Sequence, residues 1–163
     1  MSRADFSPRG TSVPLILGCG NLDRGDDAAG LLVAKQLREA GVPAEDFTAD
    51  GFALIERWTG AGHVILIDAV VTGRPLGTVS VWDESVDAEA FATSTHGIGV
   101  AHAIRLGRAF GRVPRTLRIY GIEGAQFERG SQPSEEVLNA VARIAAEIAR
   151  TLTTSPETET PAR

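Results

Sequence analysis

Three segments of the sequence carry side chains that could bind a cation or move a proton. Two adjacent aspartates, Asp26 and Asp27, lie in the glycine-rich stretch GCGNLDRGDDAAG at residues 18–30. Asp68 interrupts the apolar run HVILIDAVV, and His96 stands in the segment STHGIG. Two carboxylates and an imidazole are donors that suit a borderline divalent metal. A carboxylate of this kind could also act as a general base.

Each of these residues also has a structural explanation. An aspartate at Asp26 fits the N-cap of a helix, and one in the first turn suits the positive end of the helix dipole. Asp68 could accept hydrogen bonds from backbone amides at the end of its strand, and His96 could cap the helix that follows. However, an ionised carboxylate in a buried run costs several kcal/mol unless something pairs with it. We therefore predict that Asp26 caps the helix and that Asp27 and Asp68 are functional.

The glycine-rich stretch could instead be the start of a dinucleotide-binding loop. The pair Gly18 and Gly20 fits that motif, but its third glycine would fall at Asp23. Carboxylates also crowd the helix start, where a pyrophosphate would have to bind. A Walker A motif fails as well, because no Gly-Lys-Ser/Thr follows. The stretch is better read as a sharp turn that presents carboxylates.

The elements that must position these residues alternate between strands and helices. Apolar runs predict strands at 13–20, 44–50, 63–71, 78–83 and 116–122, and helical spacing predicts helices at 26–40, 51–60, 97–111 and 134–152. This order predicts an α/β three-layer sandwich with a mostly parallel, twisted sheet of about five strands. The strand after the turn TGRPLG is expected to run antiparallel to the one before it. In open α/β sheets ligands bind beyond the carboxyl ends of the strands, where Asp27, Asp68 and His96 would lie.

Length and composition limit the class of protein. The 163 residues suit one domain, which we expect at 13–153 between a flexible lead at 1–12 and a disordered tail at 154–163. The net charge of −5, without a basic patch, argues against nucleic acid as a partner. No apolar run approaches the roughly 18 residues of a membrane span. The single cysteine, Cys19, rules out an intrachain disulfide and fits a cytoplasmic protein.

Taken in order, the segments GCGNLDRGDDAAG, ADG at 49–51, ILIDAVV, STHGIG and YGIEG resemble the hydrogenase maturation proteases. The resemblance runs from about Val13 to Leu152. It implies a twisted sheet of about five strands flanked by helices. It also implies that Asp27, Asp68 and His96 contact a metal, which is the same set that the residue types suggest.

The resemblance further implies an activity. These endopeptidases remove a C-terminal extension from the large-subunit precursor of a nickel–iron hydrogenase after nickel has been inserted. The precursor would supply the nickel, so we expect no permanently bound cofactor, and we expect a monomer. The alternative is a nickel-site chaperone that inspects the precursor without cutting it. Whether the metal assists hydrolysis or a carboxylate acts as base with the metal positioning the substrate stays open.

The sequence departs from the familiar pattern of the family at two points near the site. Asp27 stands where glutamate is usual, which shortens the side chain by one methylene. Phe52 follows Asp50 and Gly51 where glycine and threonine often stand. Because this segment is associated with substrate choice, we assign substrate binding to Asp50, Gly51 and Phe52.

Other residues with reactive side chains have simpler explanations. Cys19 is expected to be a small buried apolar residue rather than a nucleophile. Asn21 is expected to bond backbone across the turn. His63 falls at the opposite end of its strand from Asp68, and His102 is expected at a helix surface or in packing.

Overall fold

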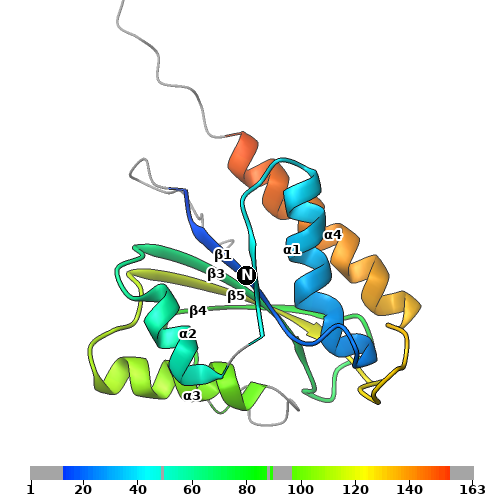
Figure 1. Ribbon diagram of the computed structural model, residues 1–163, viewed down its shortest axis with the longest axis horizontal. Coiled ribbons are helices and arrows are strands. Elements are labelled where there is room, and N and C mark those ends of the chain that lie inside the picture. The colour runs from blue at the N-terminus through cyan, green and yellow to red at the C-terminus, as the bar shows by residue number, and fades with distance from the viewer. Residues whose placement is uncertain (1–12, 49, 88, 90–96, 155–163) are drawn as a thin grey trace, which may run out of the picture.

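The computed structural model describes residues 13–48, 50–87, 89 and 97–154 (Figure 1). Its elements, in chain order, are β1 (Leu15–Cys19), the 3-10 turn η1 (Gly25–Ala28), α1 (Ala29–Glu39), β2 (Glu45–Phe47), α2 (Gly51–Trp58), β3 (His63–Val70), β4 (Val79–Asp83), α3 (Gly97–Ala109), β5 (Thr116–Glu123) and α4 (Glu135–Thr153). The predicted alternation of strands and helices is confirmed, with shifts of a few residues at the ends.

The five strands form one sheet in the order β2-β1-β3-β5-β4. The pairs β2–β1, β1–β3 and β3–β5 are parallel, and β4 pairs antiparallel with β5. The predicted antiparallel direction of β4 is therefore confirmed. Its neighbour in the sheet is β5 rather than β3, so the turn TGRPLG leads across the sheet and does not close a hairpin.

Helices cover both faces of this sheet (Figure 1). Helices α1 and α4 pack together on one face, and α2 and α3 pack together on the other. The central strand β3 supplies Ile65 and Ile67 to the first core and Val64 and Leu66 to the second. A strand buried on both faces needs apolar residues at every position, which explains the unbroken apolar run before Asp68.

Helix α1 reaches the sheet through two glycines. A Cβ atom at Gly30 would lie 2.2 Å from the carbonyl oxygen of Ile67 and 2.3 Å from that of Cys19. A Cβ atom at Gly18 would lie 2.1 Å from the carbonyl oxygen of Gly30. Only glycine fits both positions, so the start of α1 lies directly against the carboxyl ends of β1 and β3.

Two boundaries bear on the predictions made from sequence. The helix predicted from residue 26 begins with the 3-10 turn η1, and α1 follows from Ala29. The predicted lead at 1–12 and the tail residues 155–163 lie outside the described residues, so those predictions stand as predictions. Among the helices of the described ranges, none combines the length and the apolar character needed to cross a bilayer.

Candidate active site

The loop between β1 and α1 folds back on itself at Asp27. The backbone N–H of Asn21 donates to the carbonyl oxygen of Asp27 at 3.2 Å, and the N–H of Asp27 donates to the carbonyl of Arg24 at 3.0 Å. The side chain of Asn21 accepts from the N–H of Asp23 at 2.9 Å, so its predicted turn role is confirmed. These bonds hold Asp27 at 1% exposure beside the end of the sheet.

Asp26 does not cap the helix, and that prediction is wrong. Its carboxylate is completely buried and accepts from the backbone N–H groups of Ala125 and Gln126, both at 2.9 Å. It also accepts from the N–H of Ser134 at 2.6 Å and from its hydroxyl at 2.9 Å. Ser134 stands directly before α4, and its side chain bonds Asp26 rather than the helix. Asp26 thus joins the loop after β5 to the turn that carries Asp27.

The contacts of Asp26 keep it ionised. Burial acts to raise the pKa of this carboxyl, but the donors from Ala125, Ser134 and Gln126 together lower it below its ordinary value. A carboxylate that accepts several hydrogen bonds has a structural role and little basicity. Asp26 is therefore an anchor, and the functional role predicted for Asp27 stays a prediction.

Replacing Asp26 with asparagine tests this anchor. The amide offers one acceptor oxygen to donors that now share two, so buried N–H or O–H groups lose their partner. We expect the free energy of unfolding to fall by about 2–4 kcal/mol, measured by urea denaturation. Asp23→Asn, at an exposed position of the same loop, is the control and should change stability by less than about 0.5 kcal/mol. Equal stability of the two variants would contradict the anchor role.

Asp68 lies in the buried part of β3, at 4% exposure. Its Oδ1 accepts from the backbone N–H of Ala69 at 2.8 Å, so the strand-end explanation accounts for one oxygen. Burial, and then the negative charge of Asp27, raise the pKa of Asp68 to about 7, against the lowering effect of the Ala69 bond. The structure therefore brings Asp27 and Asp68 close enough for their charges to repel each other.

A cleft of about 680 Å³ opens at this end of the sheet. Its described lining comes from β1 and the loop after it, α1, β2 and the residues that follow, α2, β3 and α3: Cys19, Gly20, Asn21, Leu22, Leu31, Asp46, Phe47, Thr48, Asp50, Gly51, Leu54, Asp68, Gly99, Val100 and His102. The cleft thus gives a ligand direct access to Asp68, with Asp27 buried beside it.

The fold agrees with comparisons to known proteins. A family model described as hydrogenase maturation protease matches residues 32–151. The chain belongs to the hydrogenase maturation protease family.

Several known proteins resemble the chain in fold or in sequence. The hydrogenase maturating endopeptidase HybD from E. coli has a TM-score of 0.75 and 22% identity, over 88% of this chain and 94% of that one. The [NiFe] hydrogenase maturation protease HybD from Thermococcus kodakarensis has a TM-score of 0.70 and 28% identity, over 86% and 99% of the two chains. The hydrogenase expression/formation protein HupM from Azotobacter chroococcum mcd 1 is 32% identical over 122 residues, which are 70% of this chain and 58% of HupM.

The three residues predicted to bind substrate, Asp50, Gly51 and Phe52, differ in their position relative to the cleft. Asp50 caps α2, since its Oδ1 accepts from the N–H groups of Phe52 and Ala53, both at 3.0 Å. Asp50 and Gly51 line the cleft, whereas the side chain of Phe52 is 59% exposed and is not among the lining residues. A Cβ atom at Gly51 would lie 2.3 Å from the carbonyl oxygen of Gly99, so this glycine lets α2 approach α3.

His102 lines the cleft, a place that the sequence does not predict. Its predicted surface position is confirmed, because its side chain is exposed, but the surface in question is that of the cleft which also contains Asp68. One feature of the sequence points to this place: His102 follows Gly99 by three residues, which puts both on one face of α3. His96 lies outside the described residues, so its place in the protease site stays a prediction.

Cys19 borders the same cleft but is a poor nucleophile. Burial, and then the charges of Asp68 and Asp27, raise the pKa of its thiol well above the ordinary value. The thiolate, which is the reactive form, is therefore disfavoured at neutral pH. The buried apolar role that the sequence suggests for Cys19 agrees with its 6% exposure.

The donor set fits a cation. Two buried carboxylates that repel each other gain from a positive charge between or beside them, because such a charge allows both to stay ionised. Within the ranges that the structure describes, no group of three or more histidine, cysteine, aspartate or glutamate side chains forms a complete metal site. The third ligand predicted from sequence, His96, falls outside those ranges.

Proposed function

We propose that this protein is the endopeptidase that removes the C-terminal extension of a nickel–iron hydrogenase large-subunit precursor after nickel insertion. The observation that carries the proposal is the buried carboxylate of Asp68 in the lining of the cleft, with the negative charge of the buried Asp27 acting on it. A pair of repelling carboxylates is costly for a folded protein unless a cation joins them during function. Membership of the maturation protease family and the [NiFe] substrate named for the Thermococcus kodakarensis relative support this substrate class.

In this proposal Asp27, Asp68 and His96 bind nickel that the precursor carries. Two carboxylate oxygens and an imidazole nitrogen suit nickel, a borderline metal that accepts both donor types. The nickel belongs to the substrate, so the protease holds no permanent cofactor and reads the metal as a sign that the precursor is complete. When bound, nickel supplies positive charge that can polarise a carbonyl group.

The residues of the chain then have separate tasks. Asp27 and Asp68 fix the precursor's metal site and thereby position the scissile bond in the cleft. Asp50 and Gly51 line the wall of the cleft, and Phe52 stands exposed beside them, where the three can contact the precursor near its cut. Asp68, with a pKa of about 7 in the metal-free protein, can also exchange a proton near neutral pH.

The experiment is to incubate the protein with nickel-loaded and nickel-free precursor and to weigh the products by mass spectrometry. We expect removal of a C-terminal peptide from the nickel-loaded form alone. Binding of the nickel-loaded precursor without any cleavage would favour the non-proteolytic chaperone. Cleavage of both forms at equal rate would show that nickel is not the recognition signal.

A further inference from the structure

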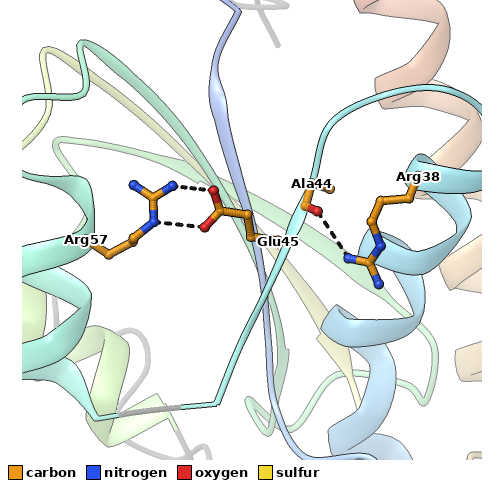
Figure 2. A network of polar contacts seen from close by, with 4 residues as sticks. All are labelled: Arg38, Ala44, Glu45 and Arg57. Atoms are coloured by element: carbon orange, nitrogen blue, oxygen red, sulfur yellow. Dashed lines mark hydrogen bonds and ion pairs between the residues drawn. The ribbon is translucent and has the colours of Figure 1, made fainter.

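The short edge strand β2 is held from both faces of the sheet. On one side Arg57 of α2 forms a two-pronged ion pair with Glu45, and its Nε donates at 2.8 Å (Figure 2). On the other side Arg38 of α1 donates to the carbonyl oxygen of Ala44 at 3.1 Å and to Asp46 at 2.9 Å. These contacts hold the three-residue strand in place, and Arg38 occupies the carbonyl oxygen of Ala44, the residue directly before it.

The backbone of Asp46 points away from the sheet. The N–H of Gly20 donates to the carbonyl oxygen of Phe47 at 3.3 Å, so Phe47 presents its polar backbone groups to the β1 side. Backbone groups alternate along a strand, so the N–H and C=O of Asp46 face the open edge, as does the carbonyl of Ala44 that Arg38 meets. Among the described residues, Arg38 occupies the outward carbonyl of Ala44, whereas no hydrogen bond reaches the outward backbone groups of Asp46, so the edge is open at Asp46.

This open segment continues into the cleft. Asp46, Phe47 and Thr48 all line it together with Asp68. Strands β1, β2 and β3 are parallel, so the end of β2 lies at the same edge of the sheet as the two buried carboxylates. None of the described residues that line the cleft comes from β4, the strand at the other edge of the sheet.

We propose that the open edge of β2 at Asp46 binds an extended segment of the hydrogenase precursor by strand addition, which guides that segment into the cleft. The proposal rests on the proposed function, since it concerns how that substrate is held. Main-chain hydrogen bonds recognise an extended chain with little regard to its side chains. Such bonds suit a tail that must pass Asp68 and then dissociate. The ion pair of Arg57 with Glu45 and the hydrogen bond of Arg38 to Ala44 limit pairing of the edge with other chains.

The test compares Asp46→Pro with Asp46→Ala. Both variants lose the ion pair to Arg38, but only proline also removes the outward N–H, and proline is tolerated where an edge strand faces outward. We expect the KM for nickel-loaded precursor to rise about fivefold to tenfold in Asp46→Pro over Asp46→Ala, more than kcat falls. Equal KM values for the two variants would overturn the proposal, provided that circular dichroism shows both folded.

A second measurement uses the wild-type protein and does not depend on cleavage. A short pulse of hydrogen exchange during incubation with saturating nickel-loaded precursor should show the Asp46 amide protected, at least about tenfold against the protein alone. An unchanged rate at Asp46 while the precursor is bound would overturn the strand addition, even if Asp46→Pro failed to fold. A protein that binds with protection but never cuts would instead contradict the proposed protease function and leave this docking mode supported.

Discussion

Replacing Asp68 with asparagine is expected to abolish removal of the precursor's tail, with a loss of at least about 100-fold in rate. Asparagine has almost the same shape, so the side chain still fits its place in β3 and can still accept from the Ala69 N–H. It lacks the charge that a cation requires and cannot take up a proton. The measurement is the mass of the nickel-loaded precursor after timed incubation with each protein.

The same loss is expected for His96→Gln, which removes the imidazole of the predicted ligand set. Glu39→Gln, an exposed position at the end of α1, is the matched control and should process precursor at the wild-type rate. If Asp68→Asn or His96→Gln processed the precursor in full, the assignment of that residue to the site would be wrong.

The central strands could be predicted from sequence because their pattern depends on local burial. A run such as HVILIDAVV has no polar alternation, and the structure shows why, since both of its faces pack against helices. Asp68 is a candidate site residue for the same reason, because burying an ionised carboxylate in such a run costs free energy unless something pairs with it. The carboxyl-edge rule then placed Asp68 and the turn of Asp27 at the same end of the sheet, as found.

The role of Asp26 could not be predicted, because its partners are distant in the sequence. Its carboxylate bonds Ala125, Gln126 and Ser134, which follow it by 99, 100 and 108 residues. An aspartate at the start of a helix has a local explanation as an N-cap, and the sequence alone therefore favours that role. Only the folded structure shows that the buried N–H groups of the loop after β5 donate to this carboxylate, so that it does not cap the helix.

The neighbour of β4 in the sheet and the place of His102 could not be predicted for a related reason. A turn such as TGRPLG fixes the direction of the next strand but not its neighbour in the sheet, and β5, which lies between β3 and β4, comes later in the chain. His102 faces the cleft only because α3 packs beside α2 through Gly51 and Gly99. The spacing of Gly99 and His102 shows that they share a face of α3, but it does not show that this face packs beside α2.

The metal-free protein is expected to lose stability relative to Asp68→Asn as pH rises from about 4 to about 7. The folded pKa of Asp68 is about 7, above its ordinary value of 3.8. Between these values the folded protein keeps a proton that the unfolded chain has lost, so each pH unit costs about 1.4 kcal/mol. The total is on the order of 4 kcal/mol, and the curve levels off once the folded carboxyl has ionised.

Urea denaturation of both proteins at pH 5, 6, 7 and 8 measures this effect. The difference between the two free energies of unfolding reports Asp68 together with its repulsion of Asp27, because the other titrating groups are common to both. We expect the free energy of unfolding of Asp68→Asn to increase relative to that of the wild type up to about pH 7, and to change little relative to it above pH 7. A difference that stayed flat from pH 5 to pH 8 would show that burial and Asp27 do not raise this pKa.

The proton on the Asp68 carboxyl is also expected to make the affinity for a cation depend on pH. A cation that binds Asp68 must displace its proton at pH values below about 7, so the affinity for added nickel is expected to rise up to about tenfold per pH unit and then level off. Calorimetry of the wild type with nickel at pH 5.5, 6.5 and 7.5, repeated in buffers of different ionisation enthalpy, counts the proton released. Because Asp68→Asn has no proton to displace, it should bind nickel weakly with no proton release from this site. That result would connect the cost of the buried carboxylate in the metal-free protein to the proposed binding of the precursor's metal.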